Sequence, residues 1–127
     1  MGERRAARSI SPFEASIGFS RALRAGNHVF VSGTAPVWED GSVDPDPEVQ
    51  ADRCLEIVVG ALREVGAEPH HVVRVRMFLT DPAYGDAVSR AYSRVFGSVR
   101  PAATQLAVKA LLDPRWKVEI EAEAIVD

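Results

Sequence analysis

Residues 100–126 decide the fold: R-P-A-A-T-Q-L-A-V-K-A-L-L-D-P-R-W-K-V-E-I-E-A-E-A-I-V. They predict two strands joined by a connection that contains Pro114. In the second strand apolar and charged residues alternate, and because a strand points successive side chains to opposite faces, one face meets a core and the other carries charge. The apolar set is Trp116, Val118, Ile120, Ala122, Ala124 and Val126, and the charged set is Lys117, Glu119, Glu121 and Glu123. The row of carboxylates must face water, cations or a ligand.

Further strands are expected upstream of this pair. Residues 17–23 and 28–32 read as a hairpin, with turn chemistry at 25–27, and residues 72–79 read as another strand. In the last of these, Val73, Val75, Met77 and Leu79 fall on one face and Arg74, Arg76 and Phe78 on the other.

Two helices are expected between the strands. Residues 46–66 and 81–97 each begin with Asp-Pro, which suits an N-cap followed by the first helical position, and each ends at glycine. Cys54 lies within the apolar stripe of the first helix, which predicts a packed core thiol rather than a reactive one. The predicted class is α+β, in the order β-β-α-β-α-β-β, with two helices on one face of a mixed sheet.

The other face of that sheet is left uncovered, because two helices cover only one face. It carries arginines and Phe78 beside the glutamate row, so neighbouring strands are expected to form Arg–Glu pairs across it. A face that mixes charge with apolar bulk predicts either solvation or burial by another copy of the chain. We expect self-association.

Length and composition indicate one soluble globular domain. The chain has 127 residues, 46% of them hydrophobic, a net charge of −3 and a sequence pI near 5.6. Residues 1–16 show no period and predict an N-terminal arm, followed by a single domain over 17–127. The acidic balance disfavours nucleic acid as a partner. A lone cysteine and the lack of a long apolar run predict a cytoplasmic protein that does not enter membranes.

Motifs with specific chemistry are few. His28, His70 and His71 lack the spacing of a zinc site, and there is no phosphate-binding glycine loop or nucleophile elbow. Ser32, before Gly33, is either an ordinary end of a strand or a place where a hydroxyl and backbone amides hold a carboxylate. Glu119 is by pattern either a solvated charge or a functional carboxylate.

Three segments carry a family resemblance: R-A-G-N-H-V-F-V-S-G at 24–33, R-P-A-A-T at 100–104 and V-E-I-E-A at 118–122. They resemble the Rid family, the YjgF-like group also known as L-PSP endoribonucleases. The resemblance covers residues 17–126. It implies a bacterial chorismate-mutase-like fold and a homotrimer with three small-molecule clefts between subunits. It also implies hydrolysis of enamine or imine intermediates without a metal or cofactor.

By position, Ser32, Gly33, Thr104 and Glu119 match the family site, with Glu119 as the catalytic carboxylate that positions water. Tyr92 matches an aromatic position near the cleft.

Two positions depart from the family pattern. Its active deaminases read P-A-R-[ST], whereas Ala103 occupies the place of the substrate-binding arginine here, and Phe19 replaces a tyrosine of the cleft. Arg100 is a poor substitute, because it has the opposite strand parity and lies across a proline. Arg21 shares parity with Phe19, and we hypothesise that it reaches the cleft and replaces the lost charge. The alternative is that Arg21 pairs with a surface or barrel carboxylate.

The sequence therefore predicts a family member with doubtful activity on 2-imino acids, since loss of a bidentate arginine contact weakens transition-state binding. The leading hypothesis is a hydrolase of an enamine, an imine or a related, less anionic metabolite. The alternative is a non-catalytic metabolite-binding or sensor protein. A ribonuclease or translation inhibitor is the third reading, which the acidic pI disfavours.

Overall fold

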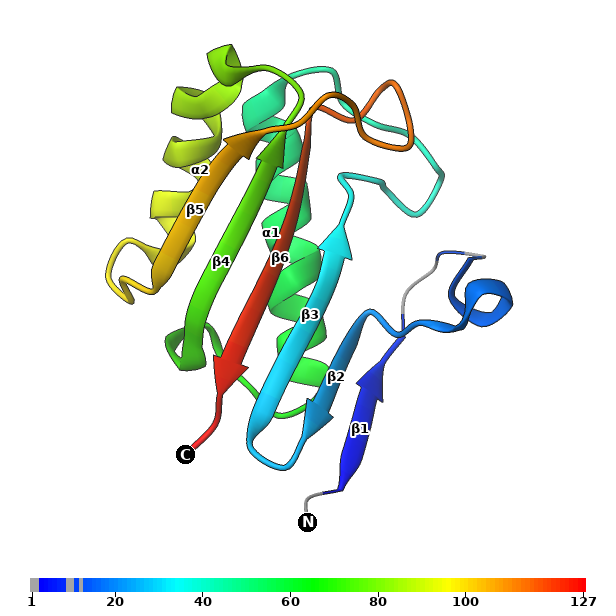
Figure 1. Cartoon of the computed structure of the whole chain (residues 1–127), viewed down its shortest axis with the longest axis vertical. Coiled ribbons are helices and arrows are strands. Elements are labelled where there is room, and N and C mark those ends of the chain that lie inside the picture. The colour runs from blue at the N-terminus through cyan, green and yellow to red at the C-terminus, as the bar shows by residue number, and fades with distance from the viewer. Residues whose placement is uncertain (1–2, 9–10, 12) are drawn as a thin grey trace.

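In the computed structural model, which describes residues 3–8, 11 and 13–127, six strands form one mixed sheet and two long helices cover one of its faces (Figure 1). The strands are β1 (Arg4–Ala7), β2 (Ala22–Ala25), β3 (His28–Thr34), β4 (Val72–Leu79), β5 (Ala102–Ala107) and β6 (Val118–Ile125), and the helices are α1 (Pro47–Glu64) and α2 (Gly85–Phe96). Short turns of helix occupy Glu14–Gly18, Pro69–His71 and Pro82–Tyr84. The strand order is β1-β2-β3-β6-β4-β5, and β4 and β5 are parallel. The predicted α+β class is confirmed.

The last strand lies at the centre of the sheet, as its alternation suggests. β6 pairs with β3 on one side and β4 on the other, both antiparallel. Its apolar residues from Val118 to Ala124 are buried under the helices, and its glutamates face the uncovered side. The period-two pattern therefore places the core correctly.

The first helix also begins and ends close to the prediction. The carboxylate of Asp46 caps α1 by accepting hydrogen bonds from the backbone N–H groups of Glu48, at 2.8 Å, and Val49, at 3.3 Å. Gly66, with φ of 82°, ends it in a backbone conformation that favours glycine. Cys54 is fully buried, and burial raises the pKa of its thiol, so the prediction of a core cysteine is confirmed.

The second helix differs slightly from the expected range. A 3₁₀ turn over Pro82–Tyr84 precedes α2, with Asp81 accepting a hydrogen bond from the N–H of Ala83 at 2.8 Å. The Asp-Pro pair thus begins the 3₁₀ turn, and regular α-helix follows from Gly85.

The N-terminal segment corrects two expectations. Residues Arg4–Ala7 are not a loose arm: they form β1 at the edge of the sheet, paired with β2. The predicted strand over 17–23 is also wrong for most of its length, because Glu14–Gly18 form a π-helical turn that ends at Gly18, whose φ is 98°. Only from Ala22 is the chain a strand. The boundary between arm and domain stays a prediction.

One residue of β4 lies on the opposite side from the prediction. A register shift between Val72 and Arg74 in the β4–β6 ladder interrupts the alternation there. As a result Val72 is buried and Val73 is 42% exposed, whereas Val75, Met77 and Leu79 are buried as expected.

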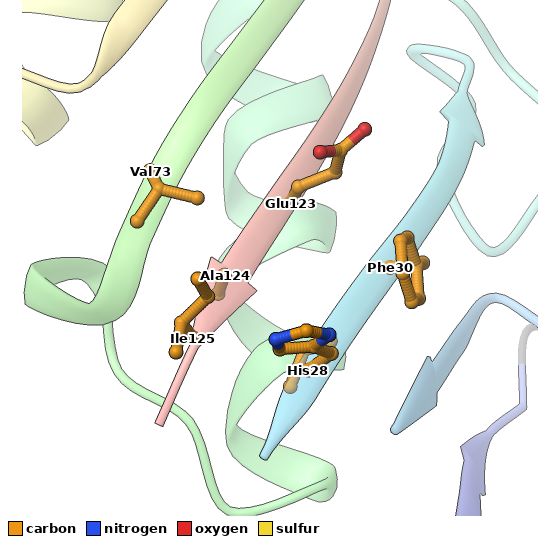
Figure 2. A pocket seen from close by; sticks show the side chains of 7 residues that line it. His28, Phe30, Val73, Glu123, Ala124 and Ile125 are labelled. Carbon is orange, nitrogen blue, oxygen red and sulfur yellow. The ribbon is translucent and has the colours of Figure 1, made fainter. Parts of the chain in front are cut away.

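The uncovered face carries the predicted charge pairs together with apolar side chains. Arg76 Nη1 lies 3.6 Å from Glu121 and 3.5 Å from Glu123. Beside them is a shallow hollow of about 110 Å³ (Figure 2). It is lined by His28, Val29, Phe30, Val73, Glu123, Ala124 and Ile125. In the described part of the chain, no helix has both the length and the apolar composition needed to cross a membrane.

Candidate functional site

The candidate site includes a close contact between Gly33 and Glu119. Gly33 lies near the end of β3, where the ladder with β6 shifts register between Val31 and Thr34. A Cβ built on Gly33 would overlap Oε2 of Glu119. The bulge and the absent side chain together let a half-buried carboxylate lie directly against the β3 backbone.

Replacing Gly33 with alanine is therefore expected to displace the Glu119 carboxylate and to reduce ligand binding or turnover at least about tenfold. Gly60→Ala is the matched control, since Gly60 lies inside α1 with nothing within 4 Å of an added Cβ. We expect that control to keep binding and to stabilise the fold by about 0.5–1 kcal/mol. Calorimetric binding and thermal melts measure both effects. Equal behaviour of the two variants would contradict a role for the contact.

Arg21, which immediately precedes β2, lies next to this contact. Its Nη2 donates a hydrogen bond of 2.7 Å to the carbonyl oxygen of Gly33, and its guanidinium lies 5.8 Å from the centre of the Phe19 ring. Its buried Nε–H has no hydrogen-bond partner among the described residues. The geometry thus brings Arg21 to Gly33 and Glu119, as the hypothesis of a replacement cation requires.

The charges at this point influence one another. Burial raises the pKa of Glu119, while Arg21 opposes that rise and Glu121 adds to it. Burial lowers the pKa of Arg21, and the carboxylates of Glu14 and Glu119 oppose that change. Glu14 is 6% exposed and belongs to the π-helical turn. Glu14 could not be predicted from the sequence, because the turn that buries it has no regular period.

Ser32 uses its hydroxyl hydrogen within the protein. Oγ donates a hydrogen bond of 2.7 Å to the carbonyl oxygen of Ser20, and the backbone N–H of Ser32 donates one of 3.0 Å to the carbonyl oxygen of Arg21. Since a carbonyl only accepts, the hydroxyl is left with acceptor capacity for a ligand. It cannot at the same time donate this hydrogen to a ligand carboxylate. We call Phe19, Arg21, Ser32, Gly33 and Glu119, together with Glu14, the β3–β6 cluster.

The remaining predicted site residues lie elsewhere. Ala103 and Thr104 are exposed on the edge strand β5, opposite Val75 and Arg76 of β4. Val75 is buried, so Ala103 lies on the helix side, and Thr104 lies on the uncovered side. Tyr92 is on α2, with its ring centre 5.5 Å from that of Phe96, and burial raises its pKa.

Ala103 and Tyr92 belong to one neighbourhood. Gln105, two residues after Ala103, donates a hydrogen bond of 2.9 Å to the hydroxyl of Ser89, one helical turn before Tyr92. We call Tyr92, Ala103 and Thr104 the β5–α2 group.

A single copy of the chain does not bring the cluster and the group together. β4 lies between β6 and β5, so the two strands that carry Glu119 and Ala103 are roughly 10 Å apart, twice the usual spacing. In one chain the predicted site residues therefore do not form a single surface, and the hollow of Figure 2 contains none of them. In the described residues no group of three or more histidine, cysteine or acidic side chains is arranged to hold a metal ion.

Comparison with known proteins gives consistent matches over almost the whole chain. The family model described as endoribonuclease L-PSP matches residues 9–126. The uncharacterized protein SCO2049 of Streptomyces coelicolor is 39% identical over 121 residues, which is 94% of this chain and 90% of that protein.

Solved structures of related proteins also match almost the whole chain. Rv2704 of Mycobacterium tuberculosis, a member of the YjgF/YER057c/UK114 family, is 35% identical with a TM-score of 0.89, covering 98% of this chain and all of that one. TdcF of Escherichia coli, solved with bound serine, is 26% identical with a TM-score of 0.82, covering 97% of this chain and 94% of that one.

Proposed function

Because this chain belongs to the endoribonuclease L-PSP family, which is the YjgF/Rid family, we propose that it hydrolyses an imine or enamine without a metal or cofactor. The observation that carries this proposal is the half-buried carboxylate of Glu119 held against Gly33. A carboxylate in such a place suits a general base, since burial brings its pKa closer to neutral pH. TdcF, a relative with bound serine, supports a small-molecule ligand.

The proposed reaction requires only proton transfers at the β3–β6 cluster. Glu119 accepts a proton from water as the water oxygen bonds to the carbon of the protonated imine, and it passes this proton to the nitrogen of the carbinolamine that results. The C–N bond then breaks as the carbinolamine hydroxyl gives its proton back to Glu119 and the carbon–oxygen double bond forms. The products are a carbonyl compound and ammonia or an amine. Arg21 keeps Glu119 ionised by opposing the pKa rise that burial causes. Its hydrogen bond to Gly33 also fixes the backbone against which Glu119 lies.

The complete cleft in this proposal forms between subunits of a homotrimer. A cleft that uses both the β3–β6 cluster and the β5–α2 group needs two copies, because β4 separates them in one chain. The uncovered face, with exposed Phe30, Leu106 and Ile125 around the Arg76 pairs, supports burial by another copy. Light scattering on the purified protein tests the trimer directly.

We also propose that the protein is cytoplasmic, because its single cysteine is buried and free, as is usual in a reducing compartment.

A second candidate is a metabolite-binding protein without turnover, favoured by two departures at the site. Ala103 supplies no charge, and Phe19 supplies no hydroxyl. One measurement distinguishes the two candidates. A hydrolase accelerates the loss of an imine generated by an oxidase, followed by trapping with semicarbazide, whereas a binding protein does not. The acidic row of β6 on the uncovered face gives no support to ribonuclease activity.

The proposed role of Arg21 predicts a pH dependence. Hydrolysis requires ionised Glu119, so the rate should fall as pH decreases through the raised pKa of that group. Arg21→Gln removes the positive charge that opposes the rise and should move this acidic limb to higher pH. Arg21→Lys retains a charge and is the control. Profiles of kcat/KM against pH measure the limb, and an identical limb in the native protein and Arg21→Gln would contradict the pairing.

A further inference from the structure

The glutamate row of β6 has a different neighbour on β4 at one of its three positions. Two of the glutamates have an arginine directly opposite them on the uncovered face, in the pairs Arg76–Glu121 and Arg74–Glu123. Glu119 lies opposite Phe78 instead. The carboxylate that the proposed reaction uses is therefore the one that meets an aromatic ring, and not an arginine, across the β4–β6 ladder.

Phe78 begins a strip of apolar surface that runs from Glu119 to the edge of the sheet. In the parallel ladder between β4 and β5, the residue opposite Phe78 is Leu106. Both side chains lie on the uncovered face, because Met77 and Leu79, the chain neighbours of Phe78, are buried beneath the helices. The strands β6, β4 and β5 lie side by side at the usual spacing of about 5 Å, so this strip extends about 10 Å from Glu119 (Figure 1). We call Phe78 and Leu106 the apolar strip.

The apolar strip is open to a ligand, whereas the β3 side of Glu119 is polar and closely packed. Phe78 is half-buried and Leu106 is 39% exposed. On the β3 side the Glu119 carboxylate lies against Gly33, whose carbonyl oxygen accepts the hydrogen bond from Arg21. The Cβ atoms of directly opposite residues are about 5 Å apart, so a substituent of about one to four carbons on a substrate held at Glu119 reaches the Phe78 ring.

We infer that Phe78 is a specificity-determining residue of this cleft, and that the substrate is an imine or enamine whose reacting carbon bears an apolar group. That group packs on Phe78 and extends toward Leu106. The inference rests on the proposed function and names its substrate class. Covering the ring and the substituent with one another removes apolar surface from water, which favours an alkyl or aryl group over a polar group of the same size.

The test compares two stable, uncharged amides on the full-length protein in its native oligomeric state. Isovaleramide carries an isopropyl group where malonamide carries a second carboxamide, so the two probes have similar size and differ in polarity. NMR titration is expected to show isovaleramide binding about tenfold more tightly than malonamide, because an apolar contact of one or two carbons is worth about that factor. Equal binding, tighter binding of malonamide, or no binding of isovaleramide overturns the inference.

Variants identify the side chain responsible. Phe78→Thr should reduce the preference for isovaleramide to about twofold or less, because threonine keeps the strand propensity but removes the ring. Phe78→Leu retains an apolar surface and should keep most of the preference.

Phe30→Thr is the matched control for Phe78→Thr. Phe30 also lies on the uncovered face opposite a glutamate of the row, Glu123, and it is 46% exposed. We expect its preference to stay native. If light scattering shows that Phe78→Thr does not assemble, Leu106→Thr retains the test, with an expected loss of about threefold in the preference. A preference that survives the threonine variants of the apolar strip, or that Phe30→Thr lowers equally, contradicts the assignment.

Turnover separates this inference from the proposed function. An amino-acid oxidase acting on D-leucine and D-alanine, and a flavin amine oxidase acting on isoamylamine and ethylamine, give imines with an isobutyl or a methyl group on the reacting carbon. These two pairs of imines differ in the presence of a carboxylate. We expect the isobutyl member of a pair that is hydrolysed to have a kcat/KM at least about fivefold higher, and Phe78→Thr to remove the difference.

The outcomes of binding and turnover are distinguishable. If isovaleramide is preferred but none of the four imines is lost faster, the hydrolase is wrong and the apolar specificity of the cleft stands. If the isobutyl and methyl imines are hydrolysed equally well and isovaleramide is not preferred, the hydrolase stands and the inference is overturned.

Discussion

Glu119→Gln is expected to reduce enzyme-catalysed imine hydrolysis by about a hundredfold or more, because the amide cannot take a proton from water. The change keeps the size and shape of a side chain that lies against Gly33. Oxidase-generated imines followed by semicarbazide trapping measure the rate, and light scattering reports whether the oligomer persists.

The stability of this variant distinguishes a catalytic from a structural role. Burial raises the folded-state pKa of Glu119, so between the unfolded and folded pKa values the folded protein binds more protons. Its stability therefore falls as pH increases through that window. A neutral glutamine removes this cost, and we expect a Tm at neutral pH that is equal to or higher than that of the native protein.

Glu123→Gln is the matched control for Glu119→Gln. Glu123 lies four residues along β6 on the same uncovered face, and it lies 3.5 Å from Arg76 instead of contacting Gly33. We expect its turnover to stay within about threefold of native. If both variants lose activity equally, the effect comes from the charge of the face as a whole. A Tm that falls by many degrees in Glu119→Gln alone would show that Glu119 is structural.

The parts of the fold that sequence predicted are those governed by local periodicity or capping. β6 is recognisable because its apolar and charged residues alternate over eight positions. α1 is recognisable because Asp46 and Pro47 begin it and Gly66 ends it. In each case the side chains that specify the element are adjacent to it in sequence.

The parts that sequence missed depend on contacts between distant segments. β1 reads R-R-A-A, which has no strand preference, and is held instead by pairing with β2 and by a 3.2 Å hydrogen bond from Arg5 to the carbonyl oxygen of Glu64. Val73 lies outside because of a bulge, which a period of two cannot express. Gly18 ends a π-helical turn through its positive φ, whereas its flanking residues resemble a strand.

The candidate site also combines features that could be predicted from the sequence with features that could not. Ser32, Gly33 and Glu119 were placed together by family resemblance, and their proximity depends on the bulge between β3 and β6. Neither the hydrogen bond of Ser32 to Ser20 nor the burial of Glu14 leaves a pattern in the sequence. Both features therefore required the structure.

Ala103→Arg is expected to restore turnover of 2-imino acids, with a gain of about a hundredfold in kcat/KM over the native protein. An arginine presents two parallel N–H donors to a carboxylate, whereas Ala103 presents none. Position 103 can accommodate it, because Ala103 is exposed on an edge strand and its side chain points toward the α2 side.

The control for this gain is Ala103→Met, which adds length without charge. Oxidase-generated imines of phenylglycine and benzylamine serve as the two substrates. The arginine variant should favour the carboxylate-bearing imine and the methionine variant should not, since only the guanidinium pairs with a carboxylate. If Ala103→Arg binds benzoate yet remains inactive, the cleft is intact and Glu119 is not placed to activate water. If it neither binds benzoate nor gains activity while its oligomer persists, the β5–α2 group does not join the β3–β6 cluster across the interface, and the intersubunit cleft is wrong.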